Sequence, residues 1–307
     1  MKPRNIPASL ILFAYNQEDY IESAVHSALS QNYEPLEILI SDDCSSDKTF
    51  SLIEKITKDY SGRHSVKINR NEQNLGLIEH INKAFSMVTG EIIAVAAGDD
   101  ISLPDRVNQI VEAYLQNNER PTLVHSSAIQ IDHQDIEAGE IKPEWGISEP
   151  QIAHSALSPA LYIGATAAYS RSLLALFPPI QNKRTYEDLV WGFRSALVKA
   201  VVYIDKPLVK YRTNVGISWK LHEGKSPQEK KASRLNKLRL YREVLKQRVC
   251  DSQSIDYPNK ATIEKKLHRE MLKTSIQISL LETPLKSLIY LAIHPRIYLR
   301  QRKKLTS

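Results

Sequence analysis

The first hundred residues alternate between short apolar runs and amphipathic segments, and this alternation restricts the fold more than any other feature. Four segments have the length and pattern of strands: the mainly apolar runs 9–15, 36–43 and 91–98, and the more polar segment 65–71. Three segments between them carry apolar side chains at helical spacing: 17–31, 45–60 and 75–88. Strands that alternate with helices predict an α/β fold with a mostly parallel, doubly wound sheet.

The middle of the chain is less regular, but its pattern still predicts strands and helices around one polar segment. Helices are expected at 104–118 and 185–200, and strands at 122–132 and 201–214, the last with a Pro interruption. Residues 162–177 predict a strand that runs into a helix. Residues 133–160 are polar and contain Pro143, Pro150 and Pro159, so we expect a loop or lid there.

The charge distribution predicts a boundary near residue 224. Residues 225–307 hold 20 of the 41 Lys and Arg residues but 7 of the 35 Asp and Glu residues, a net charge of +13 against −7 for residues 1–224. Within this basic, helical tail, residues 284–304 combine apolar and basic side chains. Either they lie on an anionic membrane surface, or they pack on the rest of the protein as ordinary core. Few aromatic residues interleave the basic ones, which argues against a specific nucleic-acid partner.

Composition sets the expected location. Cys44 and Cys250 are far apart and form no metal-type or redox-type pair, so a secreted disulfide scaffold is not expected. No uninterrupted apolar stretch reaches about 18 residues, so no membrane-spanning helix is expected. We therefore expect a cytoplasmic protein, with peripheral attachment to the inner face of the cytoplasmic membrane as an alternative that depends on the tail.

Two predicted strands end in paired carboxylates, where ligands of open α/β sheets bind. Asp99 and Asp100 follow the run "EIIAVAAG", and their oxygens suit Mg²⁺ or Mn²⁺ that is shared with a substrate phosphate. A simple Gly-Asp-Asp turn is the competing interpretation. Asp42, in "ISDDCSSDKT", could accept a hydrogen bond from a nucleobase or ribose. The alternative there is helix capping by Ser45, Ser46 or Asp47.

A third acidic pair opens the predicted helix at 185–200. Glu187 and Asp188 lie in the first turn of "YEDLVWGFR", where acidic side chains favour a helix N-terminus. A carboxylate within hydrogen-bond reach of an attacking hydroxyl can also act as a general base. The residue types alone leave both interpretations open.

Taken together and in order, the motifs resemble family 2 glycosyltransferases with the GT-A fold. The resemblance covers roughly residues 8–215 and rests on these segments: "LILFAYNQEDYIESAVHSALSQNYEPLEILISDDCSSDKTF", "NEQNLGLIEHINKAF", "TGEIIAVAAGDDISLPDRV", "YIGATAAYSRSLL", "YEDLVWGFRSAL" and "PLVKYR". It implies an inverting transfer of a sugar from a nucleotide-diphosphate sugar donor to an acceptor hydroxyl, usually with Mn²⁺ or Mg²⁺ as cofactor. The acceptor would be a glycan or a lipid-linked molecule, in bacterial polysaccharide, O-antigen or other cell-surface glycan synthesis.

The resemblance also implies roles for individual residues. Donor-binding positions are matched by Tyr15, Asn16, Glu18, Asp42, Asp43, Gly76 and Asp99. Asp42 matches the position that meets the base. Asp188, preceded by Glu187, matches the catalytic base.

One position departs from the family pattern. The first acidic residue of the family's Asp-x-Asp metal motif is Ala97 here, and Asp99 matches the second. Metal binding would then rest on Asp99, the donor diphosphate and water, with Asp100 and His222 as further candidate ligands.

The resemblance assigns each part of the predicted division of the chain to a domain. Residues 1–224 would be the GT-A catalytic domain, with a nucleotide-sugar-binding half at about 1–120 and an acceptor half at about 121–224. Residues 225–307 would be the basic helical C-terminal extension. Two alternatives stay open: a polyprenyl-phosphate sugar transferase, and a non-catalytic nucleotide-sugar-binding scaffold. The second is suggested by Ala97, which stands where the metal motif has an acidic residue.

Overall fold

The first half of the chain forms the parallel sheet that the sequence predicts. A computed structural model describes residues 5–143, 151–213 and 226–306. Its first four strands are β1 (Ala8–Ala14), β2 (Leu36–Asp42), β3 (Ser65–Arg70) and β4 (Ile92–Ala97). They are parallel and lie side by side in the order β3-β2-β1-β4. The connecting helices are α1 (Ile21–Leu29), α2 (Thr49–Lys58) and α3 (Leu77–Met87).

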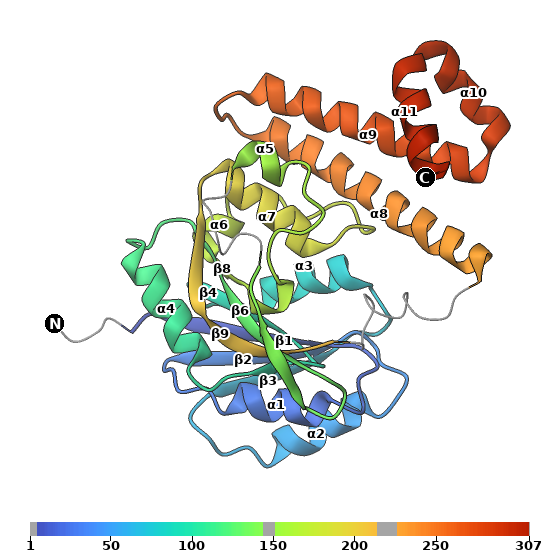
Figure 1. The fold of residues 1–307 in the computed structure, drawn as a ribbon. Helices are drawn as coiled ribbons and strands as arrows, with labels where there is room; N and C mark the ends of the chain where they lie inside the picture. The colour runs from blue at the N-terminus through green and yellow to red at the C-terminus, as the bar shows by residue number, and fades with distance from the viewer. Residues whose placement is uncertain (1–4, 144–150, 214–225, 307) are drawn as a thin grey trace.

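Helices cover both faces of this sheet (Figure 1). Leu10 and Leu12 of β1 share a buried cluster with α1, whereas Ile11 points to the opposite face and packs with Ala84 of α3. Because alternate side chains of β1 are buried on both faces, the strand is a continuous apolar run rather than an alternating one. Helix α4 (Arg106–Gln116) adds Val107, Ile110 and Val111 to the core on the α1 side.

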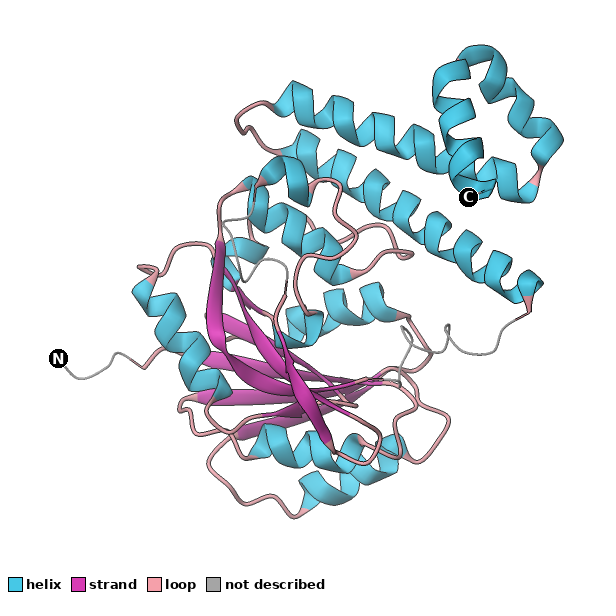
Figure 2. Ribbon diagram, in the orientation of Figure 1, coloured by secondary structure: helices cyan, strands magenta, loops and turns pink. Residues whose placement is uncertain are grey.

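The second half extends the same sheet with mixed strand directions (Figure 2). Beyond β4 the order continues β8-β6-β9-β5, and β7 pairs with β6 off this path. The bounds are β5 (Ile101–Ser102), β6 (Leu123–Ile131), β7 (Glu137–Ile141), β8 (Ala168–Ser170) and β9 (Val201–Arg212). β8 runs antiparallel to both β4 and β6, whereas β6 and β9 are parallel. The register between β6 and β9 shifts next to Pro207, so the predicted Pro interruption is confirmed.

The prediction of a continuous loop at 133–160 is wrong in part. β7 forms an antiparallel hairpin with β6, and α5 (Ile152–Ser155) follows, while residues 144–150 lie outside the described residues. The segment 162–177 contains a 3₁₀ turn, η2 (Gly164–Thr166), before β8, and a short helix, α6 (Arg171–Leu174), after it. Ser170 caps α6 by accepting a hydrogen bond from the Leu173 N–H.

The basic tail is helical, as predicted, and its first helix packs on the second half of the sheet domain. Helix α8 (Pro227–Ser254) begins with a capping box between Ser226 and Glu229. It buries Val244 and Leu245 against α7 (Glu187–Leu197). Helices α9 (Lys260–Glu282), α10 (Pro284–Ile293) and α11 (Pro295–Thr306) follow. Among the described residues, no helix has the length and apolar character needed to cross a bilayer.

Candidate active site

The carboxyl ends of β1, β2 and β4 meet at one edge of the sheet and carry most of the predicted donor-binding residues. Register pairs Ala14 with Asp42 and Phe13 with Ala97, so these three strands end side by side. This edge is where open α/β sheets bind their ligands. The sequence prediction that acidic strand ends converge is therefore confirmed for the backbone.

The loops that follow β1 and β2 are joined by a ladder of hydrogen bonds. The Asn16 N–H donates to Ser45 Oγ over 2.9 Å, and the Ser46 N–H donates to Asn16 Oδ1 over 2.9 Å. Asn16 has φ 51°, a left-handed conformation that Asn tolerates well. Glu18 accepts a hydrogen bond from the Lys48 N–H at 3.0 Å. Asn16 and Glu18 therefore build the wall of the candidate site.

Tyr15 differs from these two residues because it is 44% exposed and is among the exposed large hydrophobic residues. Its backbone N–H donates to Gln17 Oε1 over 3.2 Å, which fixes the main chain while the ring stays accessible. An exposed aromatic ring at a ligand-binding strand end is suited to stacking against a planar group.

Asp42 is fully buried, and its carboxylate organises the loop after β2. It accepts hydrogen bonds from the Ser45 N–H at 2.9 Å and from the Ser45 hydroxyl. Arg70 Nε lies 3.7 Å from Asp42 Oδ2. The alternative that Ser45 or Ser46 caps α2 is wrong, because their side chains bond to Asp42 and Asn16. Asp47, by contrast, accepts a hydrogen bond from the Thr49 N–H at the start of α2.

Asp43 holds the segment that leads into α3. Its Oδ1 accepts from Asn71 Nδ2 at 2.8 Å and from the Leu75 N–H at 2.9 Å, and its Oδ2 accepts from the Gly76 N–H at 2.9 Å. Gly76 has φ 77°, a conformation that L side chains rarely adopt. Asp43 therefore positions Gly76 at the same edge of the sheet.

The turn after β4 carries Asp99 and Asp100 in different surroundings. Asp100 is 5% exposed, and its Oδ1 accepts a hydrogen bond from the Arg212 N–H at 2.8 Å. Burial and the neighbouring Asp99 raise the pKa of Asp100 well above its usual range. Asp99 is less buried. Burial raises the pKa of Asp99 too, while the Arg212 charge opposes the shift.

Arg212 fixes this turn from the end of β9. Its Nε donates to the Asp99 carbonyl over 2.8 Å, and its other nitrogens donate to the Asp132 carbonyl and to Asp135. The guanidinium also stacks over the Tyr20 ring at 4.5 Å. Arg212 therefore holds the backbone of Asp99, while the Asp99 carboxylate has a side-chain hydrogen bond with Gln17.

Glu187 and Asp188 form the first turn of α7, as the sequence predicts. Burial raises the pKa of Glu187 to about 8, and the nearby Asp188 charge adds to the shift. Burial raises the pKa of Asp188 to about 6, while a hydrogen bond from the Leu189 N–H at 2.7 Å and the Arg248 charge oppose the shift. The two carboxyl groups titrate as an interacting pair, and burial together with their mutual repulsion keeps a proton on the pair to higher pH than on free carboxyl groups.

Two neighbours restrict the space around this acidic pair. A Cβ at Gly164, in η2, would lie 3.1 Å from Glu187 Oε1 and 3.4 Å from Asp188 Cβ. Arg248 of α8 is buried and donates to the carbonyl oxygens of Ala156, Ser158 and Leu189. The C-terminal extension therefore contributes a buried charge next to the predicted base.

Tyr211 of β9 connects the turn after β4 with the start of α7. Burial raises its pKa to about 12, and the charges of Asp100, Asp99 and Asp188 add to the shift. The same two regions are also linked through the backbone, because the Arg106 side chain donates to the carbonyl oxygens of Val95 in β4 and Ala165 in η2, while Gly164 of η2 lies against Glu187 and Asp188.

The chain's own residues suit a metal ion only as partial ligands. Among residues 5–143, 151–213 and 226–306, no cluster of three His, Cys, Asp or Glu side chains could hold an ion. Mg²⁺ in nucleotide sites is commonly bound through one or two carboxylates plus substrate phosphates and water, which Asp99 can satisfy. The predicted ligand His222 lies outside the described residues. The carboxylate of Asp100 is already engaged by Arg212.

Four basic residues at the site received no role from the sequence: Arg70, His80, Arg212 and Arg248. His80 Nε2 lies 2.7 Å from Ser41 Oγ; burial lowers the pKa of His80, against the charges of Asp43 and Asp42. Arg70 and Arg212 end strands at the ligand edge, which is a signal that could have identified them. Arg248 carries no such signal because it is one of many basic residues in the tail.

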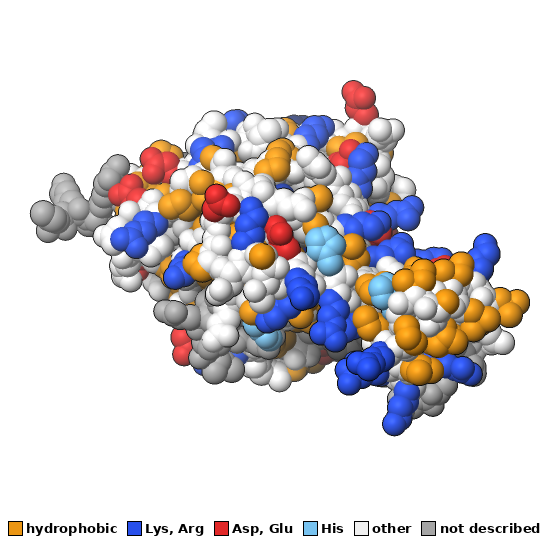
Figure 3. Space-filling view, turned by 90° about the horizontal axis from the view of Figure 1, so that it is seen from above, with side chains coloured by type: hydrophobic (Ala, Val, Ile, Leu, Met, Phe, Trp, Pro, Cys, Tyr) orange, Lys and Arg blue, Asp and Glu red, His pale blue; other side chains and the backbone are white. Residues whose placement is uncertain are grey.

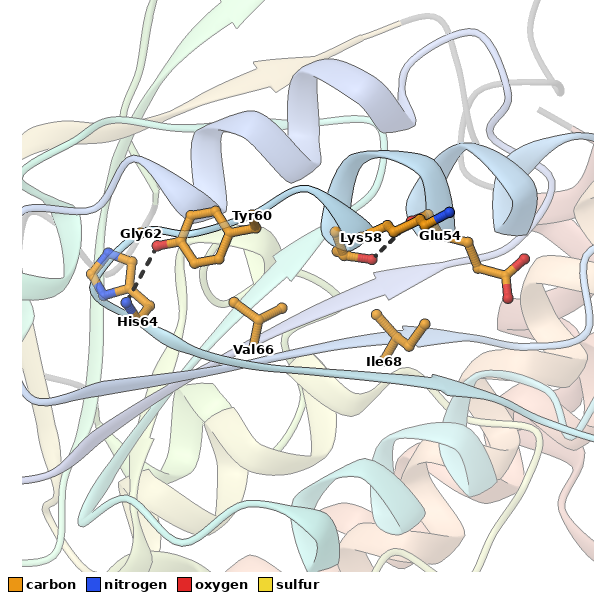
Figure 4. Close-up of a pocket in the computed structure, with 8 residues that line it drawn as sticks. Glu54, Lys58, Tyr60, Gly62, His64, Val66 and Ile68 are labelled. Atoms are coloured by element: carbon orange, nitrogen blue, oxygen red, sulfur yellow. Dashed lines mark hydrogen bonds between the residues drawn. The ribbon is translucent and has the colours of Figure 1, made fainter.

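A pocket on the outer edge of the sheet is a different feature (Figure 4). It lies between α2 and the edge strand β3, and Tyr60, His64, Val66 and Ile68 are among its lining residues. The His64 N–H donates to the Tyr60 hydroxyl over 3.3 Å, so these polar groups satisfy each other. None of the predicted site residues lines this pocket.

Comparison with known families settles the assignment. A family model described as glycosyl transferase family 2 matches residues 9–176, more than half of the chain. The chain belongs to glycosyl transferase family 2. The match contains the β1, β2 and β4 ends described above but stops before Glu187 and Asp188.

Several bacterial relatives of the family 2 chain carry glycosyltransferase names. An uncharacterized glycosyltransferase of Haemophilus influenzae is 37% identical over 118 residues, 38% of this chain and 35% of that protein. The putative glycosyltransferase EpsE of Bacillus subtilis is 31% identical over 144 residues, 47% of this chain and 50% of that protein. The UDP-Glc:alpha-D-GlcNAc-diphosphoundecaprenol beta-1,3-glucosyltransferase WfaP of Escherichia coli is 38% identical, over 33% of this chain and 39% of that protein. The matches thus span half or less of each relative.

Solved structures confirm the fold at low sequence identity. Residues 1–349 of Staphylococcus aureus TarS, in complex with UDP-GlcNAc, superpose with a TM-score of 0.62 at 16% identity and cover 96% of this chain and 79% of that one. The mannosyltransferase PcManGT of Pyrobaculum calidifontis, in complex with GDP-Man and Mn²⁺, gives a TM-score of 0.58 at 17% identity and covers 99% and 84%. The GT-A fold with a helical C-terminal extension is confirmed.

Proposed function

We propose that this family 2 chain is a metal-dependent, inverting glycosyltransferase. It transfers a sugar from a nucleoside-diphosphate sugar to an acceptor hydroxyl in the synthesis of a bacterial cell-surface glycan. The observation that supports this most directly is the placement of Asp99 just after β4, at the edge where β1, β2 and β4 end, together with a buried carboxylate, Asp188, in the first turn of α7.

The donor would lie across the ends of β2, β1 and β4. Its base would lie over the end of β2, where the partly exposed Arg70 side chain lies 3.7 Å from the buried Asp42 carboxylate, with Tyr15 as an exposed residue and Gly76 as a close backbone approach. Its diphosphate would lie near Asp99. Asn16, Glu18 and Asp43 would act by holding the loops in place, since each bonds to a neighbouring loop.

Asp99 would hold a divalent ion, Mn²⁺ or Mg²⁺, together with the donor diphosphate and water. Such an ion, when bound, stabilises negative charge on a leaving diphosphate. We assign no metal role to Asp100, because its carboxylate accepts the Arg212 N–H.

Asp188 would take the proton of the acceptor hydroxyl. The hydroxyl oxygen then forms a bond to the anomeric carbon as the bond to the diphosphate breaks, and the configuration at that carbon inverts. Ionised Asp188 suits this role at neutral pH, because burial raises its pKa to about 6 while the pKa of Glu187 lies at about 8. Glu187 would remain protonated beside it.

The acceptor class we propose is a lipid-linked glycan on the cytoplasmic face of the membrane. The name of WfaP describes transfer to a diphosphoundecaprenol-linked sugar, which is such an acceptor. Transfer to polyprenyl phosphate itself is the close alternative. A non-catalytic donor-binding scaffold remains a second candidate because Ala97 replaces a metal-motif carboxylate.

Release of nucleoside diphosphate from UDP-, GDP- and dTDP-sugars, with and without a diphosphoundecaprenol-linked acceptor, tests this proposal. Asp188→Asn keeps the shape and removes the base, so turnover should fall by about 10²–10⁴-fold while donor affinity survives. Asp205→Asn, at an exposed aspartate of β9, is the matched control and should keep full turnover. Unchanged turnover in Asp188→Asn would exclude Asp188 as the base. If none of the donors is turned over by the wild-type chain, the non-catalytic scaffold is supported instead.

A further inference from the structure

Helices α10 and α11 present an exposed apolar surface. Of the ten large hydrophobic side chains that are exposed among the described residues, five lie here: Leu285 (84%), Leu288 (50%), Ile289 (62%), Ile293 (63%) and Leu299 (55%). Figure 3 shows apolar side chains gathered on the lobe that Figure 1 labels α10 and α11. We call these five residues the tail patch. Contiguous apolar patches of this kind mark interaction sites.

The orientation of α10 is the reverse of an ordinary surface helix. Leu285, Leu288, Ile289 and Ile293 follow the spacing of one helical face, and that face points outward. The buried side carries Ser287, whose hydroxyl lies 3.2 Å from the Tyr298 hydroxyl of α11. A helix that buries Ser and exposes Leu and Ile has its apolar face available for a partner.

Basic side chains predominate around the tail patch, and the nearest acidic residue in the chain, Glu282, is paired with Arg239. From Thr283 to Ser307 the sequence contains no Asp or Glu. Six basic residues lie in the same segment, all exposed: Lys286, Arg296, Arg300, Arg302, Lys303 and Lys304. Figure 3 shows basic side chains around the rim of the apolar lobe. Apolar side chains bordered by Lys and Arg match the interface of an anionic bilayer, which offers both hydrocarbon and negative headgroups.

We propose that the tail patch docks on the surface of an anionic lipid bilayer. The segment would lie in the interface and not cross it, because α10 has 10 residues, about 15 Å of helix, against a hydrocarbon core of about 30 Å. Docking of the patch onto the same patch of a second copy is disfavoured, since it would bring the two sets of basic residues together.

The position of the tail patch fits a flat partner. α10 and α11 pack on α9 and on each other. They lie at the far corner of the molecule from the N-terminus, above the sheet in Figure 1. In that view the carboxyl ends of β1 and β9 lie toward the right, as α10 and α11 do. Docking would thus deepen the proposed function by bringing the site toward a lipid-linked acceptor, although docking itself does not depend on catalysis.

Vesicle flotation of the full chain tests the proposal. The probes are vesicles of phosphatidylglycerol with phosphatidylethanolamine, and vesicles of phosphatidylcholine as the neutral comparison. We expect binding to the anionic vesicles that weakens as salt rises. Each Leu or Ile changed to Ser in the patch should lower the partition coefficient about tenfold. Each neutralised Arg should lower it about fivefold.

The main variant is L285S/L288S/I289S/I293S, and the matched control is I136S/L176S, which changes exposed apolar residues of the catalytic half. The control should float like the wild-type chain. The single variant Leu285→Ser, at the most exposed position, keeps the test valid should the fourfold variant lose its helix content by circular dichroism.

Three results would overturn the proposal. They are equal flotation of the patch variant and wild type, equal binding to neutral and anionic vesicles, and a wild-type dimer in sedimentation that the patch variant abolishes. The last result would assign the surface to a second copy. Donor turnover measured without vesicles should be unchanged in the patch variant, so loss of docking and failure of the glycosyltransferase proposal are separate outcomes.

Discussion

Replacing Arg248 by Met should move the acidic limb of the pH–rate profile. The Arg248 guanidinium donates four hydrogen bonds to the carbonyl oxygens of Leu189, Ala156 and Ser158, and its charge opposes the rise in the pKa of Asp188. Met keeps an unbranched apolar side chain but removes the charge and every donor.

The structure sets two magnitudes for this variant. The carbonyl oxygen of Leu189 keeps its helical donor within α7, whereas those of Ala156 and Ser158 would each lose a buried donor. At about 1–3 kcal/mol for each of these two, the free energy of unfolding should fall by about 2–6 kcal/mol. Loss of the nearby positive charge should raise the pKa of Asp188 further. Since the base must be ionised, activity is lost as pH falls through that pKa. The acidic limb should therefore move to higher pH by about 1.

The assay is the release of nucleoside diphosphate across a pH series, with thermal unfolding of the same samples. Arg194→Met is the matched control, because Arg194 is equally buried at the α7–α8 interface but pairs with Asp251 at 2.9 Å. It should lose about 3–5 kcal/mol of stability without moving the limb. Arg248→Lys keeps the positive charge, so its acidic limb should lie at the same pH as that of the wild-type chain. If Arg248→Met and Arg194→Met gave the same limb as wild type, the inferred action of Arg248 on Asp188 would be refuted.

Two other predictions concern the acidic pair. Gly164→Ala would place a Cβ 3.1 Å from Glu187 Oε1, so turnover should fall about tenfold or more. The donor dissociation constant, measured by calorimetry, should stay the same, and a changed constant with normal turnover would contradict this prediction. Asp188→Asn should stabilise the fold by about 1–2 kcal/mol at pH 8 and by nothing at pH 4. Because the pKa of Asp188 is raised from 3.8 to about 6 in the folded state, the cost of the ionised carboxylate to folding grows between about pH 4 and pH 6 and is complete above pH 6. Equal melting shifts at both pH values would reject this cause.

The sequence predicted the elements whose burial follows a simple period. β1 lies between α1 and α3 and is apolar except for Ser9, and the helices that follow it show one apolar face. β7 was missed because it is an edge strand with exposed Glu and Gly side chains, which resemble a loop in composition. The tail from 284 to 304 is two helices because His294 precedes Pro295, which disfavours helical backbone at that residue.

The candidate site was predictable where residues sit at strand ends and not where long side chains reach across the fold. Asp42 and Asp99 follow apolar runs, so topology alone places them at the ligand edge. Arg248 enters the acidic region from α8, some 60 residues after Asp188 in the chain. No periodicity distinguishes this buried Arg from its exposed basic neighbours, because its burial depends on how α8 packs on α7.

Metal-linked donor binding is the most direct test of the central claim. The melting temperature of the full chain would be measured with UDP-, GDP- and dTDP-sugars, each with Mn²⁺, with Mg²⁺ and with EDTA, for wild type and for Asp99→Asn. We predict that one nucleotide class raises the melting temperature of wild type only when a divalent ion is present, and that Asp99→Asn loses most of this rise. A rise that persists in EDTA and in Asp99→Asn, or no rise with any donor, would contradict the proposed metal-dependent donor site.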